Sequence, residues 1–393
     1  MKPEAFVDPS TGHLVATIEK QLAFVPAPLP PRIDMGTIAL PLAEAMQAIG
    51  ELRGASRRLT NPYILVRPLQ RREALTSSAM EGTFTTTDHL LLAEVGVETQ
   101  TDESTKEVFN YLKALNESLS LLQSLPISHR VIKRSHEILL SGLSVARGAR
   151  KRPGEYKSDQ NWIGGYTIEK ARYVPPPPKE TQECMDYLES YINRGEITQP
   201  QALIDLALVH YQLEAIHPFS DGNGRVGRML ISLMAVHNGL LDMPILYMSP
   251  VLENVKDQYI DLMFDISTKG EWQDWLCFFF ERVCESCRET IQTVDRLIEL
   301  QNDYRERAGS ASRSANVITI VDHLFERPAL TVSDAATKLN VTYPAAKSTI
   351  DKLVEIGILF EHAGAYPKVY FAPEILRVSR TPSDDDESPE LTS

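Results

Sequence analysis

The feature that most constrains this chain is an apolar stretch followed directly by a short polar loop near the middle of the sequence. Residues 202–216 are apolar on nearly every face, which is typical of a helix buried at the centre of a domain. Residues 221–224 read DGNG, a composition that favours turns and helix starts, and a helical pattern resumes over 225–237. The sequence therefore predicts a buried helix, a tight loop and a second helix.

The loop has the composition of a phosphate-binding site. Gly222 and Gly224 allow the backbone around Asn223 to approach a ligand closely, and the free N–H groups at the start of the next helix attract anions. Arg225 and Arg228 are three residues apart on that helix, so both guanidinium groups can face the same anion.

Two further residues complete a reactive set. Asp221 would repel a bare phosphate, so its presence is explained if it holds a Mg²⁺ ion that the phosphates also bind. His217 ends the buried helix, where a neutral imidazole can take a proton from an incoming hydroxyl. Taken singly, His217 could cap a helix, Asp221 could be an N-cap, and the two arginines could form surface ion pairs. The complete set indicates phosphoryl or nucleotidyl transfer.

Residues 217–228 read HPFSDGNGRVGR, and this motif resembles, position for position, the signature of the Fic family of protein adenylyltransferases. The resemblance implies that His217 deprotonates a serine, threonine or tyrosine hydroxyl of a target protein. That hydroxyl would attack the α-phosphorus of ATP and expel pyrophosphate. The resemblance also implies that Asp221 holds Mg²⁺ and that Phe219 anchors the loop in the core.

The same resemblance implies a nucleotide-binding set whose members cradle the phosphates or neutralise their charge. Within the motif these residues are Gly222, Asn223, Gly224, Arg225, Val226, Gly227 and Arg228. Outside the motif, Tyr259 falls where related enzymes place a tyrosine against the adenosine. The alternative for Tyr259 is an aromatic residue on the core-facing stripe of a helix.

A second motif lies upstream, at residues 77–82, which read SSAMEG. Ser77 and Glu81 are four residues apart on a helix predicted over 69–81, and a carboxylate in the last turn opposes the helix dipole. This motif resembles the inhibitory motif of Fic proteins, placed here N-terminal to the catalytic core. By that resemblance, Glu81 pairs with Arg228 and occupies the space of the γ-phosphate until the helix shifts.

Residues 160–174 contain two short β-type runs and lead into four prolines at 175–178, a pattern that predicts a hairpin. Fic enzymes carry a β-hairpin flap at this place, and its backbone pairs with the target as an added strand. By resemblance, Ile163, Gly164 and Gly165 belong to the nucleotide and target site. The alternative for the prolines is an SH3-type ligand or a spacer.

The whole chain predicts a mainly α fold, a Fic helical domain with a β-hairpin flap plus a C-terminal winged helix-turn-helix domain. The expected segments are an extended arm (1–35), an N-terminal helical segment with the inhibitory helix (36–125), a catalytic core (126–304), a linker (305–315), the winged helix domain (316–378) and a disordered acidic tail (379–393). Helices are expected at 40–52, 69–81, 107–123, 128–143, 180–194, 201–216, 250–264 and 271–301.

The winged helix is predicted from three helical patterns and two strands. The helical patterns lie at 316–325, 332–339 and 343–356, and the strands lie at 358–362 and 368–372. Over 316–377, six Lys or Arg residues face seven Asp or Glu residues. This balance favours protein docking or dimerisation over DNA binding, which stays an alternative.

Composition further narrows the classes of protein to which this chain can belong. The chain has 393 residues and a formal net charge of −13, which argues against a general polyanion-binding protein. No apolar run approaches the roughly 18 residues that a membrane span needs, so we expect a cytoplasmic protein without a membrane partner. The cysteines are read as buried thiols; a metal or redox role is the alternative for Cys284 and Cys287, which are spaced as CxxC.

Over residues 30–378 the chain resembles bacterial Fic proteins of the SoFic type. The resemblance implies ATP- and Mg²⁺-dependent attachment of AMP to hydroxyls of target proteins and of the protein itself, restrained by Glu81, and a homodimer. Two alternatives stay open. One is a transcription regulator whose Fic fold senses nucleotide, and the other is a Fic enzyme that removes AMP or transfers another phosphate-linked group.

Overall fold

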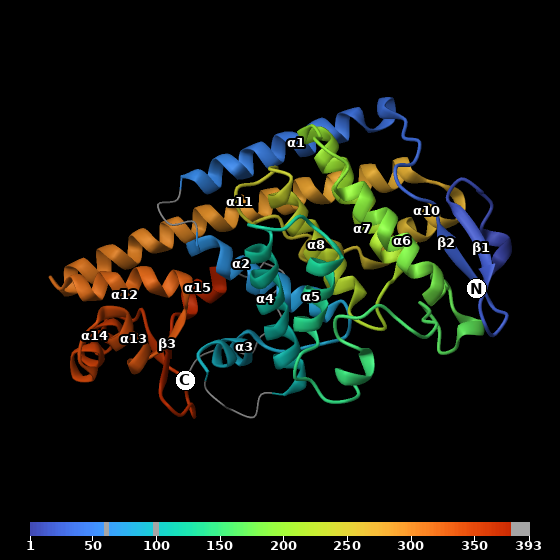
Figure 1. The fold of residues 1–393 in the computed structure, drawn as a ribbon. Helices are drawn as coiled ribbons and strands as arrows, with labels where there is room; N and C mark the ends of the chain where they lie inside the picture. The colour runs from blue at the N-terminus through green and yellow to red at the C-terminus, as the bar shows by residue number, and fades with distance from the viewer. Residues whose placement is uncertain (59–62, 97–101, 379–393) are drawn as a thin grey trace. The chain divides into compact units, whose positions relative to one another are not determined.

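The computed structural model describes residues 1–58, 63–96 and 102–378, which are mainly α-helical with a few short strands (Figure 1). This confirms the prediction of a mainly α fold. The elements in chain order are β1 (Gly12–Ala16), β2 (Leu22–Pro26), α1 (Met35–Arg57), α2 (Tyr63–Ala79), α3 (Thr87–Glu94), α4 (Glu103–Leu121), α5 (His129–Leu139), α6 (Pro178–Ile192), α7 (Gln199–Ile216), α8 (Asn223–His237), α9 (Ser249–Glu253), α10 (Lys256–Lys269), α11 (Trp272–Ala311), α12 (Ala315–Glu326), β3 (Ala329–Thr331), α13 (Val332–Leu339), α14 (Tyr343–Glu355), β4 (Phe360–Glu361), β5 (Val369–Phe371) and α15 (Pro373–Val378).

The chain forms two compact units, and their boundaries cut through several helices. The first unit contains residues 1–53, 76–83 and 110–287, and the second contains the remaining residues. All the site residues predicted from the sequence lie in the first unit.

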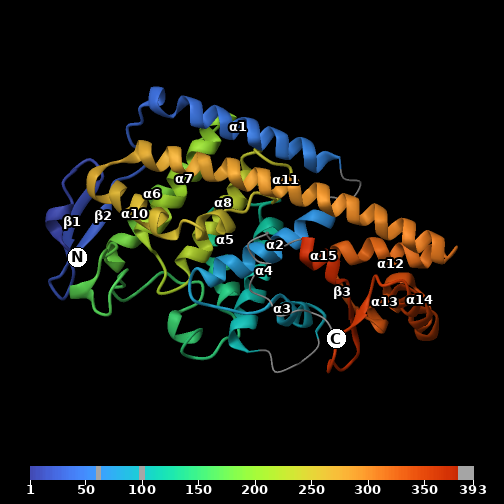
Figure 2. The same cartoon turned by 180° about the vertical axis from the view of Figure 1, so that it is seen from behind.

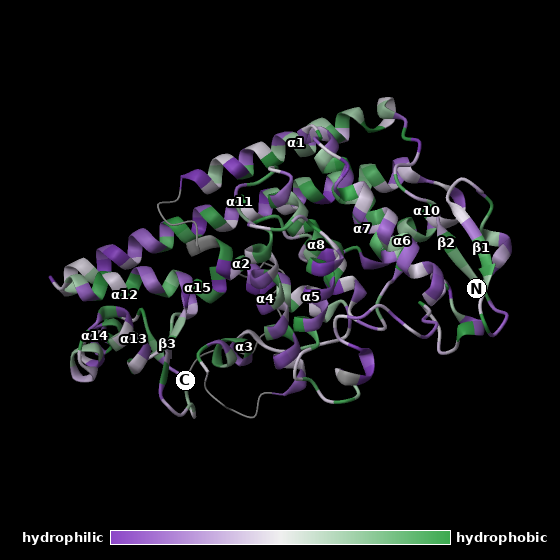
Figure 3. Cartoon of the chain, viewed as in Figure 1, coloured by the Kyte–Doolittle hydropathy of each residue, from purple (hydrophilic) through white to green (hydrophobic). Residues whose placement is uncertain are grey.

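The first unit is built around α7. Its N-cap residue, Thr198, accepts a hydrogen bond from the backbone N–H of Gln201, and every residue over 202–213 is buried. The helix packs against α6 and α8. The predicted buried central helix is therefore confirmed. In Figure 3, by contrast, α1 and α11 show hydrophilic and hydrophobic residues interspersed along their length, as helices with one buried face do.

The N-terminal residues form a hairpin rather than the expected extended arm. Strands β1 and β2 pair antiparallel from Gly12 opposite Pro26 to Ala16 opposite Leu22, and they lie side by side in Figures 1 and 2. Phe24 is buried and its N–H donates to the Val174 carbonyl at 2.8 Å. The apolar run of β2 therefore joins the core of the first unit.

The predicted flap hairpin is much shorter than expected. Ile163 and Tyr173 form a single antiparallel bridge, and a 3₁₀ turn occupies Ile168–Lys170. The two short β-type runs therefore meet as predicted, but they pair through this one bridge instead of through regular strands.

Several helix boundaries also differ from the sequence prediction. Helix α2 ends at Ala79, so Glu81 lies in the turn just beyond the helix, next to Gly82 with its φ of +80°. The predicted helix over 250–264 is split into α9 and α10. Helix α11 continues to Ala311, so most of the predicted linker is helical, because its arginines and alanines are good helix formers.

The second unit contains α12, α13 and α14 followed by the pair β4 and β5, in the predicted order. A further strand, β3, precedes α13 and gives an antiparallel sheet of order β3-β5-β4. Thr331 and Asp334 form a reciprocal capping box at the start of α13. Helices α3 and α15 were not predicted, and the predicted acidic tail lies outside the described residues.

In the part of the chain that the structure describes, no helix combines the length and hydrophobicity needed to cross a membrane. The expected buried thiols are found at Cys184, Cys284 and Cys287, whereas Cys277 is partly exposed.

Candidate active site

The predicted motif joins α7 to α8 through a loop that turns sharply at His217. This residue caps the C-terminus of α7 in the left-handed conformation (φ 48°, ψ 59°), and its N–H donates to the Leu213 carbonyl at 2.9 Å. A non-glycine residue rarely adopts this conformation, so its surroundings must hold it there.

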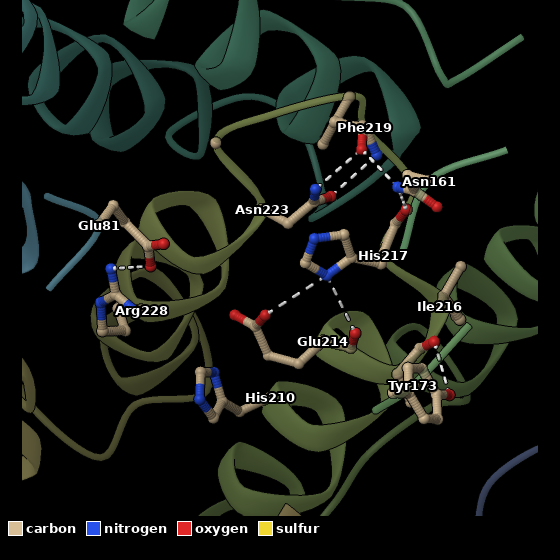
Figure 4. Close-up of polar contacts among 12 residues, drawn as sticks. Glu81, Asn161, Tyr173, His210, Glu214, Ile216, His217, Phe219, Asn223 and Arg228 are labelled. Carbon is tan, nitrogen blue, oxygen red and sulfur yellow. Dashed lines mark hydrogen bonds and ion pairs between the residues drawn. The ribbon is translucent and has the colours of Figure 1, made fainter. Parts of the chain in front are cut away.

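The loop is anchored by Phe219 and Asn223. Phe219 is fully buried and its ring stacks on His136 of α5, with centroids 3.8 Å apart. The Asn223 side chain accepts from the Phe219 N–H and donates to the Phe219 carbonyl, both at 2.8 Å, as Figure 4 shows. The expected anchoring role of Phe219 is confirmed, and Asn223 closes the loop with its side chain.

His136 also fixes the loop through hydrogen bonds. Its Nδ1 accepts from the Gly154 N–H at 2.9 Å, so its Nε2 carries the proton that it donates to the Asp221 carbonyl at 3.0 Å. Burial lowers the pKa of His136 to about 4 and keeps this ring neutral.

The His217 imidazole has a defined tautomer. Its Nδ1 lies 3.3 Å from the backbone carbonyl of Glu214, which can only accept, so Nδ1 carries the proton and Nε2 has a free lone pair. The side chain is about a fifth exposed. Burial, followed by the charge of Lys157, lowers the pKa of His217 to about 4. The ring is therefore neutral at pH 7 and able to accept a proton.

Arg228 links the motif to the residues after α2. Its Nε donates to the Ser77 hydroxyl at 2.9 Å, and its Nη2 donates to the Ser77 carbonyl and to the Glu81 carboxylate, both at 2.8 Å. Figure 4 shows the Glu81 pair beside the start of α8. Burial opposes ionisation of Glu81, but the charge and hydrogen bond of Arg228 outweigh it and lower the Glu81 pKa. The expected ion pair is present.

Gly224 lies directly under this carboxylate. A Cβ atom at Gly224 would come within 2.1 Å of Glu81 Oε1 and 2.8 Å of Arg228 Nη1. The Glu81 carboxylate therefore lies against the first turn of α8, where the N–H groups have no partner within the helix.

A cavity of about 190 Å³ extends from this point toward α10. Six of the residues predicted for the site line it, namely Glu81, Ile163, His217, Gly224, Arg228 and Tyr259. Its far part is apolar, lined among others by Ile260, Met263 and Phe264. Anionic and apolar groups can thus be held in one continuous space.

Tyr259 is buried on α10. Its hydroxyl lies 2.8 Å from Nε2 of His210, and the two rings stack with centroids 5.9 Å apart. Burial lowers the pKa of His210 to about 3, so the imidazole is neutral. Tyr259 lines the cavity and is part of the core, so the core-facing alternative is confirmed and its contact with a nucleotide stays a prediction.

The remaining predicted residues do not line the cavity. They are Ser77, Gly164, Gly165, Asp221, Gly222, Asn223, Arg225, Val226 and Gly227. Arg225 is 2% exposed, and burial lowers its pKa to about 10. Gly165 approaches the Lys170 carbonyl so closely that a Cβ would come within 2.6 Å of it. Its role in the structure is to allow the flap to turn.

Asp221 is the predicted metal ligand. Its side chain is 42% exposed, its Oδ1 accepts from the Gly222 N–H at 2.7 Å, and Arg225 and Lys151 lie 3.5 and 3.7 Å from its oxygens. Among the described residues no group of three or more His, Cys, Asp or Glu side chains could hold a metal. A single exposed carboxylate nevertheless fits Mg²⁺, which commonly takes one or two carboxylates and completes its shell with phosphates and water.

The sequence analysis missed several residues of the cavity and the loop, among them Glu214, Lys256 and Lys157. Glu214 lines the cavity, its Oε2 lies 3.9 Å from His217 Nδ1, and burial raises its pKa to about 7. Lys256 lines the cavity and donates to the Met80 carbonyl at 2.5 Å. Lys157 is buried behind His217. Glu214 alone had a signal, since it and Asp205 are the acidic residues of an otherwise mainly apolar helix.

Comparison with known proteins agrees with this arrangement. Residues 40–120 match the Fic/DOC family N-terminal model, and residues 126–235 match the Fic/DOC family model. The 217–228 motif and the residues of α8 up to 235 lie within the second match. The chain thus carries a Fic N-terminal domain followed by a Fic domain.

Curated relatives cover part of the chain. The protein adenylyltransferase Fic of Drosophila yakuba is 27% identical over 202 residues, which are 50% of this chain and 37% of that protein. The Drosophila willistoni protein of the same name is 32% identical over 120 residues, which are 30% of this chain and 22% of that protein. This chain therefore spans little more than a third of the length of these relatives at most.

Solved structures share the fold. A Fic family protein from Desulfovibrio desulfuricans G20 superimposes with a TM-score of 0.56 at 18% identity, covering 88% of this chain and 98% of that one. Fic-1 from C. elegans gives a TM-score of 0.50 at 18% identity, covering 65% of this chain and 73% of that one.

Proposed function

We propose that this protein transfers AMP from ATP to serine, threonine or tyrosine hydroxyls of target proteins. The observation that carries the proposal is the position of His217 on the same cavity as Arg228 and the first turn of α8. A proton acceptor and an anion site thus meet in one enclosed space, as nucleotidyl transfer requires.

The shape of the cavity suggests how ATP binds. The apolar end near Tyr259 and Phe264 suits the adenine ring, and the α8 end suits the phosphates. Gly224 allows phosphate oxygens to reach the helix N–H groups, and Arg228 supplies a cation beside them.

In the proposed reaction, His217 Nε2 accepts the proton of the target hydroxyl. The hydroxyl oxygen bonds to the α-phosphorus while the bond from that phosphorus to the bridging oxygen breaks, which gives a protein phosphodiester and pyrophosphate. Arg228 and Arg225 balance the charge that gathers on the pyrophosphate. An anionic triphosphate near the ring would also raise the His217 pKa toward neutrality and so strengthen it as a base.

Asp221 would hold the Mg²⁺ ion that accompanies ATP. Its exposed carboxylate lies in the loop before α8, 3.5 Å from Nη2 of Arg225. When bound there, Mg²⁺ would neutralise part of the phosphate charge. Asp221 would supply one anionic ligand and leave the other coordination positions to phosphate oxygens and water.

Glu81 would restrain the enzyme. Its carboxylate pairs with Arg228 and lies above Gly224, so a γ-phosphate would compete with it for the same donors. Like charges at this distance repel, and ATP would bind productively only after Glu81 moves away.

The flap and the C-terminal unit would serve recognition. The Ile163–Tyr173 bridge leaves neighbouring backbone groups near the cavity for pairing with an extended target segment. In the second unit we infer a winged helix that docks protein, because the exposed side of α14 mixes charges, with Lys347 paired to Asp351.

The proposal is tested with purified protein, Mg²⁺ and ATP labelled at either the α- or the γ-phosphate. Label on protein from α-labelled ATP alone supports AMP transfer. Label from γ-labelled ATP alone would indicate phosphoryl transfer instead. Parallel reactions with labelled GTP, CTP and UTP identify any other nucleotide donor, and His217→Ala is the negative control.

A further inference from the structure

Lys157 is a buried cation whose contacts are all with the backbone and with one amide. Its side chain lies in the first unit and it is 3% exposed. Its Nζ donates to Asn161 Oδ1 at 2.8 Å, to the His217 carbonyl at 3.0 Å and to the Ile216 carbonyl at 3.2 Å. Within the described residues, no carboxylate pairs with it. Burying an ammonium group is unfavourable, so these three acceptors are what hold it there.

Asn161 completes the same set of contacts. Its Nδ2 donates to the carbonyls of His217 and Phe219, both at 3.0 Å, and Figure 4 shows the amide reaching both. The bond from Lys157 to its Oδ1 fixes which end of the amide faces the loop. The His217 carbonyl therefore accepts from two side chains at once.

Both contacts are made to the backbone of His217, which has an unfavourable conformation. His217 is in the left-handed backbone conformation, which residues other than glycine rarely adopt. Such a conformation persists only where neighbouring groups fix it. The direction of the imidazole follows from that backbone, because the side chain leaves from the same Cα.

We propose that Lys157, acting with Asn161, is a positioning residue that fixes the backbone of His217 and thereby directs its imidazole into the cavity. This inference rests on the proposed function of His217 as the proton acceptor. Lys157 itself lies behind the loop and acts through the carbonyls of residues 216 and 217.

The contact has a pH dependence. Burial lowers the pKa of Lys157 to about 7. The titratable groups that face it are Cys184 on α6, whose pKa burial raises to about 11, and His217, which is neutral above about pH 4. Above pH 7 the amine has two N–H groups for three acceptors. The hold on His217 then weakens, and the turnover number should fall while nucleotide affinity changes little.

Variants at residue 157 test this in a Glu81→Gly background, where restraint is removed. Lys157→Met should lower kcat at least tenfold at pH 6.5 with the Kd for ATP unchanged. Lys157→Arg, which keeps its charge at every pH in the assay, should extend the plateau of kcat to pH 9. Asn161→Ala should lower kcat in the same way, and Lys179→Met, an exposed lysine on α6, serves as the control.

A second readout does not depend on catalysis. The Lys157 charge helps to lower the His217 pKa. An NMR titration of the imidazole should therefore show a higher His217 pKa in Lys157→Met and an unchanged one in Lys157→Arg. If Lys157→Met leaves both kcat and the His217 pKa unchanged, the positioning role is refuted. If the Glu81→Gly parent transfers no AMP, the proposed function fails, and the titration alone decides the positioning role.

Discussion

Glu81 Oε1 lies 2.8 Å from Nη2 of Arg228, above the first turn of α8. The two residues are 147 positions apart in the chain, yet their ion pair lies at the proposed anion site of the 217–228 motif. Arg228 is 3% exposed, and its guanidinium also donates to Ser77. The Arg228 guanidinium, which lines the cavity, is thus partnered by both Glu81 and Ser77.

Removing the Glu81 carboxylate should therefore activate the protein. We expect Glu81→Gly to raise the initial rate of AMP transfer roughly 5- to 150-fold, the range of a typical coupling free energy. Initial rates with α-labelled ATP measure the effect, and Glu196→Gly, an exposed glutamate of the same unit, is the control. Equal or lower activity in Glu81→Gly would refute restraint by this residue.

Gly224 should be intolerant of any side chain. In Gly224→Ala the methyl group would fill the space between the first turn of α8 and the anion, where Glu81 now lies. We expect ATP affinity to fall by about tenfold or more, equivalent to at least about 1.4 kcal/mol, even when Glu81→Gly is also present. Isothermal titration calorimetry of the double variant measures it. Full affinity in that variant would show that phosphates bind elsewhere.

Arg228 should matter for productive binding. Arg228→Ala removes the cation beside the proposed leaving group, and we expect kcat/KM to fall by about 10²- to 10³-fold. The loss should persist in a Glu81→Gly background, because it arises from the missing contact between Arg228 and the substrate and not from the restraint by Glu81. Arg130→Ala, an exposed arginine on α5, is the matched control. Unchanged KM and kcat would remove Arg228 from the mechanism.

Buried histidines should make the fold sensitive to acid. His210 has a folded pKa of about 3 against 6.5 for the free side chain, so the unfolded chain alone takes up a proton between these values. Its contribution to stability is complete above pH 6.5 and is lost as pH falls toward 3. Compared with His210→Gln, the wild type should lose about 3 kcal/mol more free energy of unfolding between pH 7 and pH 4.

Urea unfolding followed by tryptophan fluorescence reports this difference, because Trp275 stacks near His210 with centroids 6.2 Å apart. His13→Gln, at an exposed position in β1, should follow the wild-type pH dependence. Parallel curves for the wild type and His210→Gln would contradict a depressed pKa at His210.

The parts of the site that the sequence predicted are those in which neighbours in the chain are neighbours in space. Residues 217–228 form one helix end, one loop and one helix start, so their spacing fixes their geometry. The pairing of Glu81 with Arg228 was expected from resemblance alone, since nothing in the local pattern of either segment specifies the other.

What could not be predicted depends on contacts distant in sequence. Lys157 sits in a basic stretch that looks like a solvated loop, and only the folded chain brings it to carbonyls 59 and 60 residues away. His136 likewise reaches Asp221 from α5. Helix ends were hard to predict for a different reason. The linker expected at 305–315 contains helix-forming residues, and α11 continues through them to Ala311.

The central claim, that His217 and the start of α8 transfer AMP to a hydroxyl, is tested most directly by intact-protein mass spectrometry. Glu81→Gly, wild type and the His217→Ala/Glu81→Gly double variant are each incubated with ATP and Mg²⁺, alone and with a cell lysate. We predict the added mass of AMP on Glu81→Gly itself or on lysate proteins, less with the wild type, and none with the double variant. An AMP adduct formed equally by the double variant, or no adduct with any of the three proteins, would contradict the claim.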